Sequence, residues 1–505
     1  MTIFLVSREY RGLAEAGGIK DVVREMAETW NNLGHKAAVL LPFYGFLSGK
    51  LPEGILEFQG NFNFQTPISF EVRKIVYETV DIHFFHLSSF RDKKGVYTYT
   101  ADEEKQNPFH LRGHGHIDGS WMNIIFQRAV AEYLLGGRIR PDVVHCHDGH
   151  TAWIPVLLKT APRYREVLGQ IKTLVTIHNA GIGYHQEIQD WDPVSLYVGL
   201  EASVLETSRI GQAYDPLAAA GLYSHLNTVS PFYAQEIMDQ SGQNTVGFLG
   251  NYLRERGIKL TGIFNGIDPK GKDPRFPKEA GLPYGFDPRK MDEGKRACRR
   301  SLSAKILYPR EKIYGNLEQA ENTVLFSMQS RITGQKGVEK LLRILPDLLP
   351  DLRLSFLIMG EGEKTYEIAL QSLANEWSSQ GRFVFINTYD ESYSPLVFAS
   401  GDFFLIPSLY EPCGLTDLKA LLMGNIPIVH GVGGLKKITD HQTGLVMDNL
   451  EEDLTQTILE AARIALESPD TLAKMRIQGF EMVMRDFSWE RVLLDHYEKL
   501  FRLIL

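Results

Sequence analysis

The chain has 505 residues, too many for one hydrophobic core, so we expect two or three domains. Hydrophobic residues make up 44% and charged residues 23%, which is ordinary for a globular protein. The net charge of −8 argues against a chain-wide nucleic-acid surface, the three cysteines are too few for a disulfide framework, and no apolar run is long enough to cross a bilayer. No basic segment precedes the short apolar start of the chain, so we expect no signal peptide and a cytoplasmic protein.

Short apolar runs alternate with longer amphipathic runs, which predicts an α/β protein whose parallel sheets are covered by helices. In the first half the predicted strands are residues 2–6, 37–41, 143–145, 172–177 and 224–228. In the second half they are residues 323–328, 353–359, 383–386, 402–406 and 426–429. Between the halves, residues 268–284 are rich in Pro, Gly and Lys, which is typical of a linker.

One predicted turn combines a carboxylate with free backbone amides. Residues 408–416 (Ser-Leu-Tyr-Glu-Pro-Cys-Gly-Leu-Thr) follow a strand and precede a helical pattern. The amides of Cys413, Gly414, Leu415 and Thr416 would point at the same space as the Glu411 carboxylate. Amides at a helix N-terminus hold anions, and carboxylates hold sugar hydroxyls. The turn therefore predicts a site for a sugar phosphate or a sugar nucleotide.

A pair of cations, Arg331 and Lys336, lies in another predicted strand-to-helix loop. Arginine offers a planar fork of donors, and lysine offers a mobile point charge. Together they could neutralise a diphosphate leaving group through charge-assisted hydrogen bonds about twice as strong as neutral ones. A solvated loop with two ordinary surface cations accounts for the same residues, so this pattern alone leaves both alternatives open.

A series of motifs resembles, in residue type and order, those of bacterial glycogen synthases and plant starch synthases, which are retaining glucosyltransferases of the GT-B fold. The motifs span nearly the whole chain, although the resemblance is poor around residues 85–118 and 270–320. They are Glu9 with Gly17-Gly18-Ile19-Lys20-Asp21-Val22, His145-Cys146-His147-Asp148, Thr176-Ile177-His178-Asn179, Asn227-Thr228-Val229-Ser230, Phe264-Asn265-Gly266-Ile267-Asp268, Ser330-Arg331 to Lys336-Gly337, Glu411 to Thr416, Gly433-Gly434-Leu435, and Phe487-Ser488-Trp489.

The resemblance implies two Rossmann-like domains facing across a cleft, with ligands bound outside the carboxyl ends of the strands. Residues 1–268 would form the acceptor-side domain, and residues 321–486 the nucleotide-sugar domain. Residues 269–320 would be a linker and irregular crossing. Residues 487–505 would form a helix that crosses back to the first domain.

The resemblance also implies roles for individual residues. His178 would contact the donor glucose near its reactive carbon, Glu411 would hold the same sugar, and Arg331 and Lys336 would stabilise the leaving diphosphate. Tyr389 matches an aromatic residue that stacks on the nucleotide base, although an exposed loop tyrosine is the simpler alternative. The other implied donor-binding residues are Gly17, Gly18, Asp148, Asn265, Cys413, Gly414, Leu415 and Thr416.

The run His145-Cys146-His147-Asp148-Gly149-His150 also allows a different function, that of a metallohydrolase. Imidazoles two residues apart face the same side of an extended chain and could share a metal through His145 and His147. No further ligand is obvious from the sequence. We therefore favour the glucosyltransferase interpretation, in which Asp148 lines the cleft, the histidines of this run are structural, and neither a metal nor a cofactor is expected.

Two positions depart from the family pattern. Glu15 stands where the family has a lysine that approaches the donor's phosphates, and Asp417 stands where the bacterial members usually have glutamine. An anion about 4 Å from a phosphate charge costs on the order of 4 kcal/mol at an effective dielectric constant of 20. Glu15 therefore points away, Lys20 or Arg11 supplies the missing charge, or the substrate differs.

The function expected from these patterns is transfer of glucose from a nucleotide diphosphate glucose, ADP-glucose being favoured, to the non-reducing end of an α-1,4-glucan with retention. The alternatives are a related GT-B enzyme with another donor or acceptor and a glucan-binding relative whose turnover is weakened by Glu15. The expected partners are the donor and the α-glucan, without nucleic acid or membrane.

Overall fold

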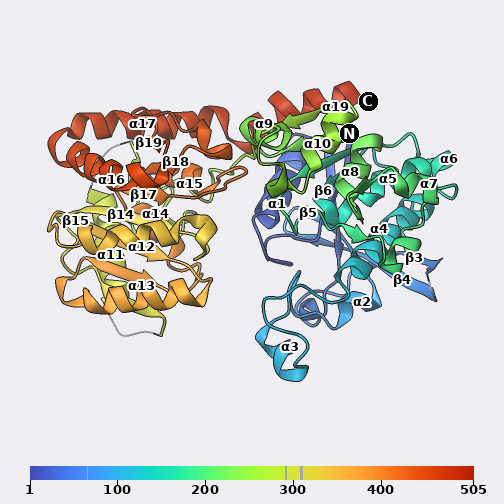
Figure 1. Ribbon diagram of the computed structural model, residues 1–505, viewed down its shortest axis with the longest axis horizontal. Helices are drawn as coiled ribbons and strands as arrows, with labels where there is room; N and C mark the ends of the chain where they lie inside the picture. The colour runs from blue at the N-terminus through green and yellow to red at the C-terminus, as the bar shows by residue number, and fades with distance from the viewer. Residues whose placement is uncertain (65, 290–292, 308–310, 505) are drawn as a thin grey trace. The chain divides into compact units, whose positions relative to one another are not determined.

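The computed structural model describes residues 1–64, 66–289, 293–307 and 311–504, which form two compact α/β units (Figure 1). The first unit comprises Met1–Phe264 with Val492–Leu505, and the second comprises Asn265–Arg491. Each unit contains a largely parallel sheet, which confirms the fold class that the alternating runs predict. No helix in these described ranges is both long and apolar enough to cross a membrane.

The first unit is built on a nine-stranded sheet in the order β12-β11-β7-β6-β1-β2-β5-β4-β3. Its pairs are parallel from β12 through β5, and β4 and β3 continue it antiparallel. The strands are β1 (Thr2–Val6), β2 (Lys36–Pro42), β3 (Ile55–Asn63), β4 (Pro67–Tyr77), β5 (Val80–His86), β6 (Val143–His147), β7 (Lys172–Ile177), β11 (His225–Thr228) and β12 (Leu260–Gly262). A small separate sheet holds β8 (Ile188–Gln189), β9 (Arg209–Ile210) and β10 (Ala213–Tyr214).

Helices of the first unit connect and cover these strands. They are α1 (Ile19–Asn32), α2 (Ser88–Arg91), α3 (Ala101–Gln106), α4 (Gly119–Gly136), α5 (Trp153–Thr160), α6 (Arg165–Leu168), α7 (Ala202–Glu206), α8 (Pro216–Tyr223), α9 (Pro231–Met238) and α10 (Leu249–Glu255). Each of α8 and α9 starts with a proline after a capping side chain, Asp215 or Ser230, that accepts hydrogen bonds from the first turn.

The second unit has a seven-stranded sheet in the order β13-β16-β15-β14-β17-β18-β19, in which only the edge strand β13 is antiparallel to its neighbour. The strands are β13 (Ile313–Asn316), β14 (Val324–Gln329), β15 (Leu354–Met359), β16 (Phe383–Ile386), β17 (Phe403–Ile406), β18 (Ile426–His430) and β19 (Leu445–Met447). The helices are α11 (Glu293–Leu307), α12 (Val338–Leu348), α13 (Lys364–Glu376), α14 (Ser394–Ser400), α15 (Thr416–Leu422), α16 (Leu450–Glu467), α17 (Pro469–Asp486) and α18 (Trp489–Val492).

The segment expected as a linker, residues 269–320, contains regular structure within its described part. Helix α11 and strand β13 both lie there, and both belong to the second unit. Residues 290–292 and 308–310 of this segment lie outside the described residues. The chain ends in a helical run that continues from α18 through a π turn (Leu493–Tyr497) into α19 (Glu498–Ile504). In the first unit, Phe501 of this run stacks on Trp30, with ring centroids 5.6 Å apart; Leu505 is not among the described residues.

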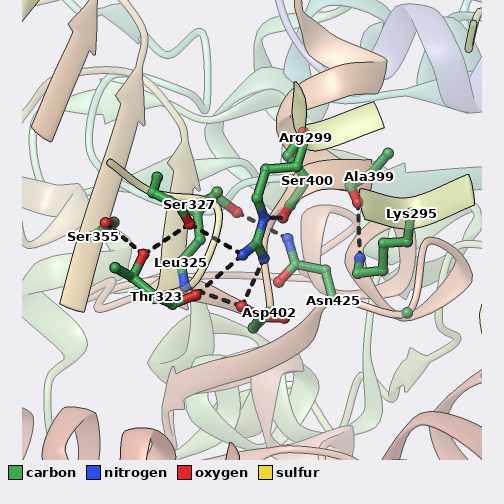
Figure 2. A network of polar contacts seen from close by, with 12 residues as sticks. Lys295, Arg299, Thr323, Leu325, Ser327, Ser355, Ala399, Ser400, Asp402 and Asn425 are labelled. Carbon is green, nitrogen blue, oxygen red and sulfur yellow. Dashed lines mark hydrogen bonds and ion pairs between the residues drawn. The ribbon is translucent and has the colours of Figure 1, made fainter. Parts of the chain in front are cut away.

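A buried group of cations fixes the C-terminal ends of α14 and α15 in the second unit (Figure 2). Lys295 donates to the carbonyl oxygens of Ala399 and Met423 at 2.9 and 3.0 Å. Arg299 donates to the Asp402 carboxylate at 2.7 Å and to the last carbonyl of α14 at 2.9 Å. Cations at helix C-termini satisfy carbonyls that have no partner within the helix. The cluster thereby anchors α15, whose opposite end begins at the 413–416 turn.

Candidate functional site

The motif residues of each unit follow neighbouring parallel strands, so they gather at one edge of each sheet. In the first unit, Glu9, Asp148 and His178 follow β1, β6 and β7, which are neighbours in the sheet. In the second unit, Arg331 and Glu411 follow the neighbouring strands β14 and β17. The carboxyl ends of strands are where open α/β sheets bind ligands, and the structure therefore places two groups of candidate residues at such edges.

In the first unit, the glycine-rich loop before α1 is held by the buried carboxylate of Glu9. Its Oε2 accepts hydrogen bonds from the N–H groups of Gly17 at 2.5 Å and Ala16 at 3.2 Å. Burial raises the pKa of Glu9, while these hydrogen bonds and one from Tyr97 oppose the rise. The Gly17 N–H is thus hydrogen-bonded within the protein. A Cβ on Gly18 would meet nothing within 4 Å, so of the two glycines only Gly18 faces open space.

Glu15, at the position where the family lysine stands, is tied down within its own loop. Its Oε2 lies 2.8 Å from Nζ of Lys20, and its Oε1 accepts the Gly12 N–H at 2.6 Å. Partial burial acts to raise the pKa of Glu15, but the hydrogen bonds from Lys20 and Gly12 lower it below its usual value. Arg11 is committed elsewhere, to Asp21 and Glu25. The anion at position 15 is therefore compensated by Lys20.

Asp148 uses its carboxylate inside the protein to fix the end of β7. Its Oδ1 accepts the His178 N–H at 2.6 Å, and the Asn179 N–H donates to the same carboxylate. The residue is 2% exposed and adopts a φ of 58°, which is rare for a residue other than glycine. Burial raises the pKa of Asp148 to about 7 despite these hydrogen bonds. Asp148 therefore positions the backbone that carries His178.

The histidines of the 145–150 run lie close together, as their spacing predicts. The rings of His145 and His147 stack with centroids 4.4 Å apart, because β6 extends to residue 147 and both side chains leave the same face. Nε2 of His145 contacts the hydroxyl of Thr176 at 2.6 Å, and Nδ1 of His147 contacts Nε2 of His178 at 2.9 Å. Within the described residues, no group of three or more His, Cys, Asp or Glu side chains is arranged to hold a metal ion.

The contacting rings of His145, His147 and His178, here called the histidine row, predict that the folded protein loses stability in acid. Burial lowers the pKa of both His145 and His178 to about 3, whereas unfolded histidine titrates near 6.5. Below pH 6.5 the unfolded chain therefore binds more protons, and each histidine costs about 1.4 kcal/mol of folding free energy per pH unit. Asp148, whose raised pKa lets the folded state take up a proton below about 7, offsets part of this loss.

The matched variant His145→Gln retains an amide at the Nε2 position but cannot titrate. Between pH 6 and 4 its free energy of unfolding, measured in urea, should fall less steeply than that of the unmodified chain, by about 1.4 kcal/mol per pH unit. Equal slopes for the two proteins would show that His145 is already protonated in the folded state.

In the second unit, the candidate catalytic residues Lys336 and Glu411 form an ion pair. Nζ of Lys336 lies 2.6 Å from Oε2 of Glu411, and both side chains are 16% exposed. Lys336 ends a short 3₁₀ turn, and Gly337 follows with a φ of 72°. A Cβ at Gly337 would come within 1.9 Å of the Pro407 carbonyl oxygen, so a glycine is needed for the loops after β14 and β17 to approach.

Arg331 extends from the start of the same loop and is exposed. Within the described ranges its guanidinium makes no hydrogen bond or ion pair with the protein, which leaves its donors available to a ligand. Tyr389 lies close enough to be affected by this charge: burial raises the pKa of the phenol, and Arg331 lowers it. The ring of Tyr389 is nevertheless 41% exposed, as a stacking platform for a ligand would be.

The turn at residues 413–416 is shaped by a buried cation that the sequence analysis missed. Nζ of Lys437 donates to the carbonyl oxygens of Cys413 at 2.7 Å and Gly414 at 2.8 Å, and it pairs with Asp417 at 2.6 Å. With these carbonyls turned toward Lys437, and with Gly414 at a φ of 72°, the turn leads into α15. The N–H groups of Gly414, Leu415 and Thr416 donate no hydrogen bond within the described residues.

Asp417 is fully buried, and burial raises its pKa to about 6 although Lys437 acts to lower it. The departure from the family's glutamine is thus matched by a cation in contact with it. Lys437 stands two residues after the Gly433-Gly434-Leu435 motif. A carboxylate at a buried helix N-terminus requires such a partner, and this requirement was the one signal that could have pointed to Lys437.

Asn265, one of the residues expected to bind the donor, lies beside this turn. Its N–H donates to the sulfur of Cys413, whose pKa burial raises to about 11. The residue is 3% exposed, and its side-chain Oδ1 is buried without a hydrogen-bond partner. A buried, unpaired amide oxygen costs free energy unless a ligand or water satisfies it. Asn265 therefore points to a ligand next to the 413–416 turn.

Comparisons with known proteins agree along the whole chain. The model of the starch synthase catalytic domain matches residues 2–251, and that of glycosyl transferases group 1 matches residues 321–463. The glycogen synthase of Vibrio cholerae is 29% identical, covering 99% of this chain and 98% of its own length. The glycogen synthase of Aliivibrio fischeri is 27% identical, covering 99% of this chain and 97% of its own length.

Among solved structures, the catalytic domain of starch synthase IV from Arabidopsis thaliana, bound to ADP and acarbose, superposes with a TM-score of 0.79 at 23% identity over 100% of this chain and 99% of that chain. Sucrose-phosphate synthase from Thermosynechococcus elongatus gives a TM-score of 0.57 at 15% identity over 100% and 98% of the two chains. These matches confirm the GT-B fold, and the family assignment favours a glycosyltransferase over the metallohydrolase alternative built on His145 and His147. The chain therefore belongs to the family of glycogen synthases and starch synthases and is a glycosyltransferase.

Proposed function

We propose that this enzyme transfers glucose from ADP-glucose to the non-reducing end of an α-1,4-glucan with retention of the anomeric configuration. The observation that carries the proposal is the arrangement beside β14 and β17 of the second unit. The loops that follow these two neighbouring strands carry an exposed Arg331 and the Lys336–Glu411 ion pair. They also carry the N–H groups of residues 414–416, which donate no hydrogen bond within the described residues. Cations, free amides and a carboxylate together suit a nucleotide diphosphate sugar.

In the proposed mechanism, Arg331, Lys336 and the amides of residues 413–416 stabilise the departing diphosphate. Donors already held in place where charge develops are usually the largest catalytic contribution, because they need no reorganisation during the reaction. Glu411 holds the glucose as its anomeric carbon gains positive charge. In the first unit, His178 offers its ring to a sugar hydroxyl. Tyr389 stacks on the base, and Asn265 places its unpaired oxygen toward the donor. No metal is required, since cationic side chains supply the positive charge.

The choice of adenine rests on the relatives. Glycogen synthases match this chain over nearly their whole length, and the starch synthase IV structure holds ADP and acarbose. A structure of the same fold holds UDP instead, at 11% identity. The base therefore has to be tested directly, together with the acceptor.

A donor panel tests the proposal. The enzyme is incubated with ADP-glucose or UDP-glucose, with or without a linear α-1,4-glucan, in the presence of a chelator, and released nucleotide is measured. We expect release of ADP that depends on the glucan and survives chelation. Glucan binding without release from either donor would instead indicate a binding protein. Activity lost on chelation and restored by zinc would favour metal-dependent chemistry at the 145–150 histidines.

Glu15→Lys should lower activity rather than restore a family feature. The new ammonium group would face Lys20, from which Glu15 is now 2.8 Å distant, and the Gly12 N–H would lose its acceptor. We expect weaker donor binding and slower transfer in Glu15→Lys, measured beside Glu15→Gln, which keeps an acceptor oxygen for Gly12. Tighter donor binding with faster transfer in Glu15→Lys would instead mean that Glu15 repels the diphosphate and that this enzyme is a weakened synthase.

A further inference from the structure

The side chain of His178 has two ring nitrogens in different situations. Nε2 contacts Nδ1 of His147 at 2.9 Å. Nδ1 makes no hydrogen bond within the described residues, and the ring is only half-buried. Burial lowers the pKa of His178 to about 3 and holds the pKa of His147 well below its usual value, so both rings are neutral and each carries one proton. If Nδ1 carries the proton, it can donate a hydrogen bond to a ligand. If Nε2 carries it, Nδ1 can only accept one.

The neighbouring ring, His145, shows how protons are distributed in this row. The Thr176 hydroxyl has one proton and donates it to Oδ1 of Asn227 at 2.7 Å, while the amide of Asn227 donates to the Tyr497 hydroxyl at 3.1 Å. Nε2 of His145, 2.6 Å from the same hydroxyl, must then be the donor to Thr176. The other nitrogen of His145, Nδ1, is left bare, and it is buried without a partner. This outcome follows the general preference, since a buried N–H without an acceptor is rarer than an unpaired acceptor.

The same rule applied to His147 fixes the tautomer of His178. Nε2 of His147 is also buried without a partner. A proton there would be a buried N–H without an acceptor, so the proton belongs on Nδ1 and is donated to Nε2 of His178. With Nε2 occupied as an acceptor, His178 carries its own proton on Nδ1.

We propose that His147 is a positioning residue that holds His178 as the Nδ1–H tautomer, so that the free ring nitrogen of His178 is a hydrogen-bond donor. The proposal rests on the proposed function in one respect: the oxygen that accepts this hydrogen bond belongs to the bound sugar. In this state His178 cannot take a proton from the acceptor glucan through Nδ1, and Nε2 is occupied. Its role is to hold a hydroxyl oxygen, while His145 supports His147 by ring stacking.

The tautomer can be measured without any substrate. The full chain is labelled with ¹⁵N-histidine, and two-bond ¹H–¹⁵N correlations identify the protonated nitrogen of each ring. The signals of His178 are assigned as those that disappear from the spectrum of the His178→Asn variant. His185 is an internal standard for a doubly protonated ring, because its nitrogens contact Asp215 and the Ala180 carbonyl and its pKa is raised to about 9, the ion pair outweighing burial. We expect a protonated Nδ1 and a bare Nε2 for His178. The reverse pattern would overturn the proposal.

Two pairs of variants connect the tautomer to catalysis. Asparagine places an amide nitrogen where Nδ1 of histidine stands, and glutamine places one where Nε2 stands. His178→Asn should therefore keep about tenfold more turnover than His178→Gln, the value of about one hydrogen bond. Likewise His147→Asn should preserve the Nδ1–H signal of His178, whereas His147→Leu, of similar size and burial, should lose it and lower kcat about tenfold.

The outcomes separate this proposal from the proposed function. The expected ¹⁵N pattern in a chain that transfers no sugar would leave the tautomer standing and refute the function. Transfer activity with a His178 Nε2–H pattern, or with an unchanged pattern in His147→Leu, would refute the positioning role of His147 and leave the function standing.

Discussion

Arg331→Ala and Lys336→Ala should each lower the turnover number by about 10²–10³, the usual cost of removing one group that stabilises developing charge. Arg331 has no ion pair within the described residues, so its removal should scarcely change the free energy of unfolding. Lys336→Ala also leaves Glu411 without its partner at 2.6 Å, so this variant should bind donor more weakly as well. Initial rates at saturating donor and glucan give the turnover number of each variant.

Two nearby cations of α12 provide matched controls. Lys340 pairs with Glu451, and Arg343 pairs with Glu339, so neither belongs to the site. Lys340→Ala and Arg343→Ala should keep turnover within about twofold, since surface ion pairs contribute about 0–1 kcal/mol. If Arg331→Ala and Lys336→Ala both behave like these controls, the two cations do not hold the diphosphate.

Lys437→Met should damage both stability and donor binding. The substitution leaves the buried Asp417 without its partner and removes the donor to the carbonyls of Cys413 and Gly414. Breaking one half of a buried ion pair typically costs 3–5 kcal/mol, so we expect a loss of about that size in the free energy of unfolding. The 413–416 turn should also lose its shape, which weakens the affinity for ADP measured by calorimetry.

A double variant separates these two effects. Lys437→Met combined with Asp417→Leu removes both charges, and such replacements are often neutral or stabilising, so most of the lost stability should return. Affinity for ADP should not return, because the 413–416 turn still lacks the ammonium group that donates hydrogen bonds to its carbonyls. Lys436→Met, at an exposed neighbouring position, should change stability by less than about 0.5 kcal/mol. Full donor affinity in the double variant would contradict the role assigned to Lys437.

The sequence predicted the parts of the fold that are marked by continuous apolar runs. Central parallel strands are buried on both faces, so β14, β15 and β17 could be found within about a residue of their ends. Strands β3 and β4 were missed because they form the antiparallel end of the sheet and are partly exposed, so their apolar residues are interrupted. Helix α11 was missed for a related reason, since few of its residues are apolar.

Interactions between distant residues were harder to predict than the motifs themselves. The sequence singled out Lys336 and Glu411 but gave no sign that they pair, because the pairing depends on two loops brought together at Gly337 and Pro407. For Glu15 it left open whether Lys20 or Arg11 supplies the missing positive charge, and the structure shows Lys20 paired with Glu15 itself. Gly17 was expected to approach the diphosphate, yet its N–H is hydrogen-bonded to Glu9, which lies eight residues earlier and was not among the expected site residues.

The linkage of the product shows whether the enzyme transfers glucose with retention. ADP-glucose labelled in its glucosyl carbon C1 is incubated with a linear α-1,4-glucan and the enzyme, and the ¹³C spectrum of the recovered glucan is recorded. We expect label in new α-1,4-linked terminal glucose, in an amount equal to the ADP released. A β-linked product, or label found only in free glucose, would contradict it.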